Sequence, residues 1–193
     1  INNDNGIKAL TLVKDLVDAG SMSKEVINWT QGDVMNQFIS GNIAMMVNGP
    51  WQVPTMREQA PDLNWDVTLL PKDAEYASCL GGENFGVIDG DNVDAALDFL
   101  QFATSKDEVA SYIDDFGYIA ARKDVAEGQF TDDETMQKFT EEMQYAQPRG
   151  PHAQWPEISD ALSLAVNESI TGTSAPADAA AKAQSTIDGI LAE

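Results

Sequence analysis

The stretch Phe38-Ile-Ser-Gly-Asn-Ile-Ala-Met-Met-Val-Asn-Gly-Pro-Trp51 combines several local signals that decide the fold. Gly41 is typical of a helix end, and the apolar run from Ile43 to Val47 is too short for a helix and predicts a buried strand. Asn48-Gly49 indicates a tight turn, and Pro50 is favoured at the first position of a helix. The stretch therefore predicts a helix, a strand, a turn and a second helix in that order.

This order gives Trp51 a particular place. A side chain in the first turn of a helix that follows a strand lies over the carboxyl end of the sheet, where open α/β sheets bind ligands. A large flat ring there offers a small molecule a stacking surface. The alternative is plain packing of the indole in the core.

The same stretch resembles the signature Phe-x-x-Gly-x-x-Ala-Met-x-x-x-Gly-Pro-Trp of the family 1 extracellular solute-binding proteins, the maltose-binding-protein-like sugar receptors of ABC importers. Two further segments resemble this family: Leu80 to Val87 is similar to its crossover between two lobes, and Pro148 to Trp155 with the following helices is similar to its C-terminal end. The matching signature positions are Phe38, Gly41, Ala44, Met45, Gly49, Pro50 and Trp51.

The resemblance implies an α/β fold, namely the helix-rich C-terminal part of a two-lobed periplasmic-binding-protein type II fold with few short strands. Members of the family are longer than the 193 residues present, so the N-terminal half is expected to be absent. Residues 1–80 would form part of the C-terminal lobe. Residues 81–128 would hold the crossover and part of the N-terminal lobe, and residues 129–193 would return to the C-terminal lobe.

Composition restricts the partners. The chain is 43% hydrophobic and 22% charged, as in ordinary soluble globular proteins, and it has no apolar run of the roughly 18 residues that a membrane span needs. A net charge of −21 makes nucleic acid and anionic membranes poor partners, whereas a neutral carbohydrate is not repelled. Cys79 is the single cysteine, which excludes an internal disulfide.

Helical periodicity and end signals predict helices over about 7–17, 30–40, 51–60, 93–104, 105–117, 131–143, 156–170 and 175–191. Capping residues are expected at the pairs Thr30/Asp33, Ser105/Glu108 and Thr131/Glu134, and at Ser174. Strands are expected over 43–47, 65–70, 85–88 and 118–121, with a polar loop over 71–85. These strands are too few for two doubly wound sheets, so the fragment alone is expected to self-associate.

Motifs for catalysis are scarce. With one histidine, His152, and one cysteine, the chain has no zinc constellation and no Cys-His dyad at credible spacing, and Asp89 to Asp94 departs from the calcium-loop pattern. We therefore expect no metal, no cofactor and no catalytic residue. The enzyme alternative is glycoside hydrolysis by a carboxylate pair, for which Glu83 and Glu157 are the candidates.

The residue types suit a sugar site better, because a sugar ring stacks its C–H faces on indoles and its hydroxyls need polar partners. Trp51 and Trp155 are the predicted stacking residues, whereas Trp65 is assigned to the core and Trp29 to a helix staple. The glycine-flanked segment with Gly82, Glu83 and Asn84 would supply polar contacts or form a structural turn. Arg149 would donate to hydroxyls or pair with one of the many acids.

As the resemblance implies, the protein would capture an oligosaccharide outside the cell and deliver it to ABC permease subunits. It would be extracellular or periplasmic, held by a lipidated N-terminus that this sequence lacks. A ligand-free interaction module on the same fold is the remaining alternative. The sequence does not name the sugar.

Overall fold

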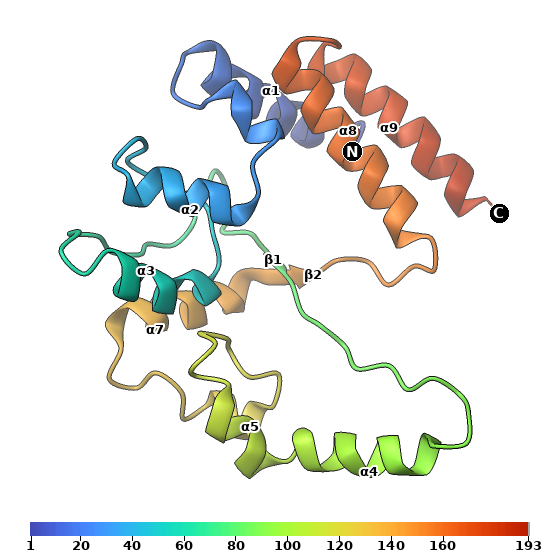
Figure 1. Cartoon of the computed structure of the whole chain (residues 1–193). Coiled ribbons are helices and arrows are strands. Elements are labelled where there is room, and N and C mark those ends of the chain that lie inside the picture. The colour runs from blue at the N-terminus through green and yellow to red at the C-terminus, as the bar shows by residue number, and fades with distance from the viewer. Residues whose placement is uncertain (193) are drawn as a thin grey trace. The chain divides into compact units, whose positions relative to one another are not determined.

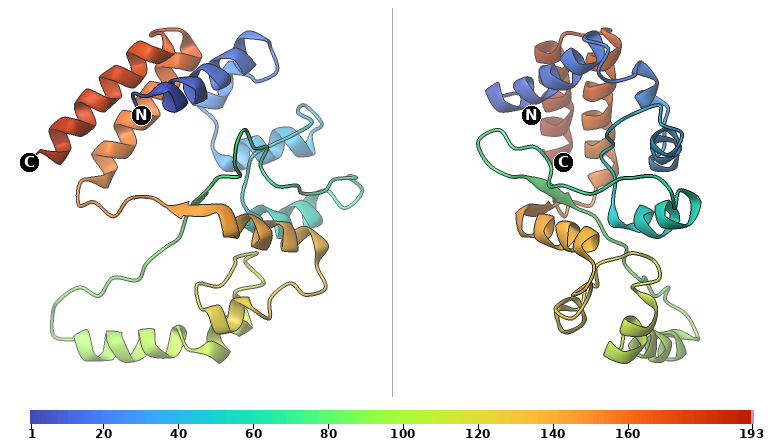
Figure 2. Two further views of the ribbon diagram at one scale, coloured as in Figure 1. Left: turned by 180° about the vertical axis from the view of Figure 1, so that it is seen from behind. Right: turned by 90° about the vertical axis from the view of Figure 1, so that its left-hand side faces the viewer.

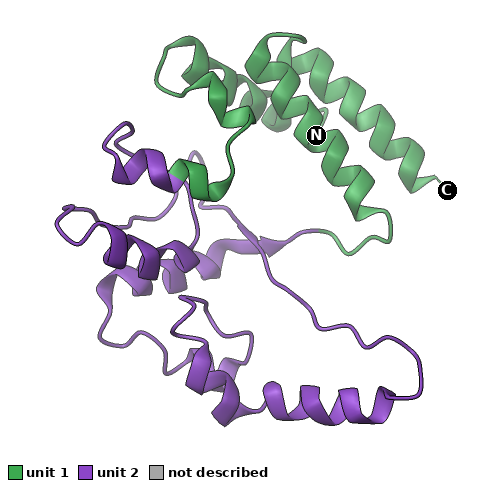
Figure 3. Ribbon diagram, in the orientation of Figure 1, with its two compact units in different colours: residues 1–34, 150–193 green, residues 35–149 purple. Residues whose placement is uncertain are grey.

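The computed structural model describes residues 1–192, in which helices predominate (Figure 1). The chain divides into two compact units (Figure 3): unit 1 comprises residues 1–34 and 150–193, and unit 2 comprises residues 35–149. Unit 1 is therefore assembled from both ends of the chain, and unit 2 from its middle. Each unit is described by itself.

Unit 1 is a helical unit built on α1 (Asp4–Asp18), α8 (Trp155–Thr171) and α9 (Pro176–Leu191), with the short 3-10 helix η1 (Lys24–Ile27). Both views of Figure 2 show α8 and α9 side by side. One cluster of its core consists of a single large side chain among small ones, which lets the helices approach closely. Its buried members are Leu10, Ala165, Ala179, Ala180 and Ala183.

The helix ends of unit 1 follow most of the predicted signals. Thr30 and Asp33 form the predicted reciprocal pair at the start of α2 (Gln31–Ile39): the Thr30 backbone N–H donates to the Asp33 carboxylate at 2.8 Å, and the Asp33 N–H donates to the Thr30 hydroxyl at 3.2 Å. The carboxylate accepts from the Thr30 backbone N–H and also, at 2.7 Å, from the Thr30 hydroxyl, and these two hydrogen bonds hold the pKa of Asp33 below its ordinary value. The predicted cap at Ser174 is wrong, because Ala175 occupies the N-cap of α9 and Pro176 opens the helix.

Unit 2 alternates short helices with long connections. Its elements after α2 are η2 (Pro50–Gln52), α3 (Val53–Gln59), β1 (Ser78–Leu80), α4 (Val93–Ala103), α5 (Lys106–Tyr112), α6 (Lys123–Ala126), α7 (Glu134–Glu142), η3 (Met143–Tyr145) and β2 (Ala146–Pro148). The strands β1 and β2 pair in parallel, with Ser78 opposite Ala146 and Leu80 opposite Pro148. Among residues 1–192 they form the only sheet.

The predictions of four strands are wrong. None of the segments 43–47, 65–70, 85–88 and 118–121 forms a strand, and β1 lies in the stretch that was expected to be a loop. Met45 is 86% exposed and Ile88 is 92% exposed. A strand exists only where a second backbone completes the ladder, which hydropathy alone does not reveal. Segment 65–70 keeps the predicted alternation of half-buried and exposed side chains without a partner strand.

Two helix starts in unit 2 use other residues than expected. Ser105 precedes α5 without a side-chain cap, so its capping box with Glu108 is not formed. Asp133, rather than Thr131, caps α7 by accepting from the Met136 backbone N–H at 3.1 Å. The predicted helix over 105–117 ends early, at Tyr112, and a turn follows. The remaining predicted helices form within a few residues of their expected ends, and α6 is an additional short helix.

Candidate functional site

Trp51 lies in η2, at the helix start that the sequence predicted. Pro50 opens this turn with its fixed φ, and Gly49 precedes it as the N-cap. The indole is half-buried and folds back over the Cα of Gly49, where a Cβ would lie 2.1 Å from the ring atom Cη2. Trp51 is therefore held against its own backbone and is partly accessible to a ligand.

An aromatic row continues from Trp51 along the turn after α5. The ring centroids of Trp51 and Tyr118 lie 6.2 Å apart, those of Tyr118 and Phe116 lie 6.3 Å apart, and those of Phe116 and Tyr112 lie 6.2 Å apart. Such separations are typical of interacting aromatic pairs. Tyr118 is 37% exposed and Phe116 is 57% exposed, so the row, defined here as Trp51, Tyr118, Phe116 and Tyr112, presents aromatic surface to solvent.

Gly117 lets the turn that carries Phe116 and Tyr118 pack against the segment that carries Trp51. It is buried with φ at +66°, a conformation that glycine adopts without strain. A Cβ at this position would lie 2.8 Å from the Pro50 carbonyl oxygen and 2.9 Å from Cδ of Pro54. The turn around Gly117 thus approaches the start of η2 and α3 more closely than any other residue type allows.

Gln129 fixes the backbone between Tyr118 and Ala120 and also bonds the Asp114 side chain. Its side-chain oxygen accepts from the Ala120 N–H at 2.7 Å, and its amide nitrogen donates to the Tyr118 carbonyl at 3.1 Å and to the Asp114 carboxylate at 2.5 Å. Ala120 itself is buried in a small cluster with Val109 and Val125. Tyr118 therefore stands on a backbone that is anchored by hydrogen bonds and by apolar packing.

A cavity of about 460 Å³ lies next to this junction, and Val53, Pro54 and Gly117 contribute to its lining. On its polar side Arg57 donates two hydrogen bonds to Asp133, at 2.7 and 2.9 Å. This bidentate pair lowers the pKa of Asp133 and raises that of Arg57, chiefly through the side-chain hydrogen bonds. The pair ties α3 to the start of α7.

The other predicted polar residues of unit 2 follow its two strands. Because β1 and β2 are parallel, the segments after them leave the same end of the sheet, and Nη2 of Arg149 lies 3.8 Å from where a Cβ of Gly81 would be. Gly82, Glu83 and Asn84 continue from there as an exposed segment. Within residues 1–192, the side chains of Glu83, Asn84 and Arg149 make no hydrogen bond or ion pair.

Trp155 belongs to unit 1, whereas the other predicted site residues belong to unit 2. It is the half-buried first residue of α8, and its backbone N–H donates to the His152 carbonyl at 3.0 Å. Trp29 and Trp65 are also half-buried. Sequence reasoning missed Tyr118 and Phe116, because no local motif marks them and they meet Trp51 only through the fold.

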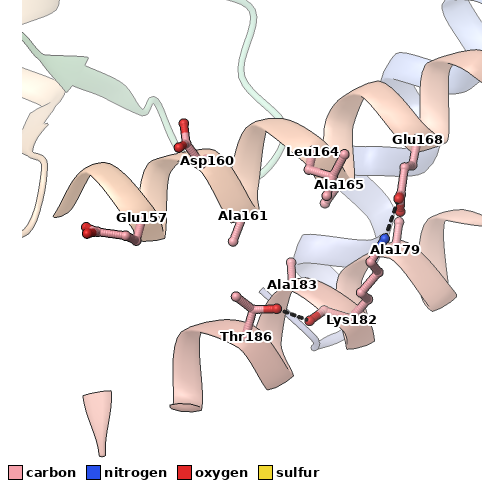
Figure 4. A pocket seen from close by; sticks show the side chains of 10 residues that line it. All are labelled: Glu157, Asp160, Ala161, Leu164, Ala165, Glu168, Ala179, Lys182, Ala183 and Thr186. Atoms are coloured by element: carbon pink, nitrogen blue, oxygen red, sulfur yellow. Dashed lines mark hydrogen bonds and ion pairs between the residues drawn. The ribbon is translucent and has the colours of Figure 1, made fainter. Parts of the chain in front are cut away.

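Unit 1 carries a separate pocket of about 280 Å³ between α8 and α9 (Figure 4). Glu157, Asp160 and Glu168 line it, and Lys182 pairs with Glu168. Glu83 lies in unit 2, so the two candidate carboxylates of the enzyme alternative are not brought together within one unit.

Among residues 1–192, no cluster of histidine, cysteine, aspartate and glutamate is placed to hold a metal ion. Over the same residues, no helix has the length and apolar character needed to cross a membrane.

The chain was compared with known proteins. Proteins named as binding proteins, from Brucella abortus (strains 2308 and 9-941) and from Brucella suis biovar 1, are each 27% identical over an alignment of 191 positions that covers 95% of this chain and 46% of theirs. The chain thus spans about half the length of these curated relatives.

A solved structure gives the fold. The cyclic alpha-maltosyl-1,6-maltose binding protein from Arthrobacter globiformis matches 98% of this chain and 49% of its own, with a TM-score of 0.73 and 22% identity. This match confirms the expected helix-rich part of a two-lobed periplasmic-binding-protein type II fold. Residues 2–141 match the family described as bacterial extracellular solute-binding protein. The chain belongs to this family of bacterial extracellular solute-binding proteins.

Proposed function

We propose that the chain forms part of a carbohydrate receptor for an ABC importer. The observation that supports this most is the aromatic row, in which the half-buried indole of Trp51 is paired with the exposed ring of Tyr118. Stacking of aromatic rings on the apolar faces of a sugar is the main non-polar contribution to such binding. The name of the Arthrobacter globiformis protein points to the same ligand class.

Polar residues near the strand ends complete the proposal. Glu83 and Asn84 accept from sugar hydroxyls, Arg149 donates to them, and Gly82 allows the ligand to approach the backbone. None of these side chains is engaged in a hydrogen bond or ion pair within residues 1–192, which favours a ligand role. The net charge of −21 disfavours anionic ligands, whereas a sugar is neutral. Trp155 is the second stacking residue of the proposal.

The proposal for the whole protein extends further than this chain. Residues 1–80 and 129–193 contribute to one lobe, and residues 81–128 to the crossover and the other lobe. Closure of the lobes on the sugar shifts the population to a form that the permease subunits recognise. The receptor acts outside the cell or in the periplasm, and a lipid anchor holds it at the membrane.

Titration calorimetry tests the ligand class. The probes are maltotetraose and cyclic alpha-maltosyl-1,6-maltose, chosen from the ligand that the Arthrobacter globiformis protein is named for. We expect saturable binding of at least one probe. Trp51→Ala should lose about 1 to 3 kcal/mol of binding free energy, the amount that a central aromatic contact contributes. Trp29→Phe, in unit 1, is the control and keeps its affinity. Binding that is unchanged in Trp51→Ala would remove Trp51 from the site.

A further inference from the structure

We infer that Gly49 is a positioning residue for the aromatic row, because the absence of its side chain provides the space in which the indole of Trp51 rests. The effect on sugar affinity rests on the proposed function. The effect of Gly49 on the position of the Trp51 ring does not depend on the proposed function, because it follows from the packing alone. The inference thus names a residue that acts on a ligand through Trp51 without touching it.

The packing at Gly49 is specific to one ring. An added Cβ would lie 2.1 Å from Cη2, 2.3 Å from Cζ3 and 2.4 Å from Cζ2 of Trp51. Non-bonded carbons sit about 3.5 to 4.0 Å apart, so a methyl group and the indole cannot occupy these positions together. All three closest atoms belong to the same six-membered ring, and Gly49 is buried beneath it.

The backbone of Gly49 does not itself require glycine. Its φ of −109° and ψ of 168° lie in the extended region that alanine also adopts. Gly117 differs, because its φ of +66° is strained for other residues and its neighbours are the backbone oxygen of Pro50 and the ring of Pro54. Position 49 therefore needs glycine to leave room for the indole. A larger side chain there displaces the indole and does not strain the backbone.

Displacement of the indole changes the aromatic row. A methyl group at position 49 forces Trp51 into another rotamer, because the preceding turn and Pro50 fix its backbone. The contact between Trp51 and Tyr118, at 6.2 Å between centroids, is then lost. The surface that we propose for a sugar loses Trp51, while Tyr118 keeps its own support from Gln129.

Fluorine NMR on protein labelled with 5-fluorotryptophan tests the ring position without any ligand. The chain has four tryptophans, and Trp51→Phe assigns the signal of interest. We expect Gly49→Ala to shift the Trp51 signal and to leave those of Trp29, Trp65 and Trp155 in place. Gly90→Ala is the matched control in unit 2, since a Cβ there meets nothing within 4 Å. A Trp51 signal that Gly49→Ala leaves unchanged would overturn the inference.

A suppressor variant covers the case in which Gly49→Ala does not fold. If the indole is what the methyl group meets, the double variant Gly49→Ala/Trp51→Ala folds, and the inference holds. If the double variant also fails to fold while Trp51→Ala alone folds, position 49 needs glycine for another reason and the inference is wrong.

Affinity measurements distinguish a failure of this inference from a failure of the proposed function. With maltotetraose as probe, we expect Gly49→Ala to weaken affinity about tenfold or more, and to have no further effect once Trp51→Ala is present. An additional tenfold loss in the double variant would contradict action through Trp51. If maltotetraose and cyclic alpha-maltosyl-1,6-maltose fail to bind the unaltered protein, the proposed function is contradicted, whereas the NMR result still decides the positioning inference.

Discussion

At the scale of single residues, Gly117 is a position where both the backbone conformation and the packing require glycine. Its φ of +66° and the 2.8 Å approach of a Cβ to the Pro50 oxygen act together. We expect Gly117→Ala to lower the free energy of unfolding by about 1 to 2 kcal/mol from backbone strain alone, with more from the close contact. Urea denaturation followed by circular dichroism measures this.

Gly128→Ala supplies the control for Gly117, because its Cβ would meet only the Val125 carbonyl oxygen, at an ordinary 3.7 Å, and its φ is not positive. Equal stability of the two variants would show that the turn around Gly117 relaxes and that its packing on Pro50 is not a constraint.

The ion pair of Arg57 and Asp133 gives a pH-dependent prediction. The folded state lowers the pKa of Asp133, so the stabilisation is present above its ordinary pKa of about 3.9 and is lost as the pH falls through the lower, folded value. Asp133→Asn keeps the N-cap of α7 but removes the charge. We expect it to destabilise unit 2 by up to about 1 kcal/mol at pH 7, since both partners are partly exposed.

The difference between Asp133→Asn and the unaltered protein should shrink as the pH falls below 4, and denaturation at a series of pH values measures it. Asp132→Asn, the exposed neighbour, is the control and should show no such trend. A difference that stays constant across the series would mean that the ionised form of Asp133 does not contribute through its ion pair with Arg57.

At the scale of elements, the helices could be predicted and the strands could not. Periodicity places Leu10 in the core, and Gly20 and Gly41 end helices in the left-handed conformation, as their sequence positions predict. These signals are local. The strands β1 and β2 are three residues long each and form only because two segments that are distant in sequence pair. No local sequence pattern predicts this pairing.

In the candidate site too, local sequence places some residues and only the fold places others. Trp51 could be placed at a helix start from its own neighbours, because Gly49 and Pro50 are adjacent in sequence. Tyr118 could not be paired with it, since that pairing depends on the turn at Gly117.

A prediction at this scale concerns the packing of α9 in unit 1. Ala180 is fully buried among α1, α8 and α9, whereas Ala181, the next residue of α9, is exposed. We expect Ala180→Leu to destabilise the protein by about 1 to 3 kcal/mol, because the helices are too close to accommodate the added carbons. Ala181→Leu should change stability by less than about 0.5 kcal/mol. Thermal denaturation of the two variants compares them directly, and similar melting temperatures would mean that the bundle repacks freely.

At the scale of the whole chain, several large apolar side chains are exposed. The helix α4 has no buried residue, and Leu97, Phe99 and Phe102 on it are 51%, 62% and 58% exposed. Three large apolar side chains exposed on one helix that has no buried residue are unusual in a monomeric soluble protein. The chain spans about half the length of its curated relatives, which supports the view that further chain covers such surfaces in them.

These exposed side chains lead to the prediction that residues 1–193, produced alone, associate with themselves. A second copy covers the apolar surface of α4, and the net charge of −21 opposes growth beyond a small closed oligomer. Light scattering coupled to size-exclusion chromatography should show a mass above 20.9 kDa that rises with protein concentration and with salt, since salt screens the repulsion. Phe102→Ser should reduce this mass, and Gln101→Ser, an exposed neighbour on the same helix, should not. A monomer at every concentration and salt level would mean that the exposed face of α4 does not drive association, and that the chain is stable with its apolar side chains in water.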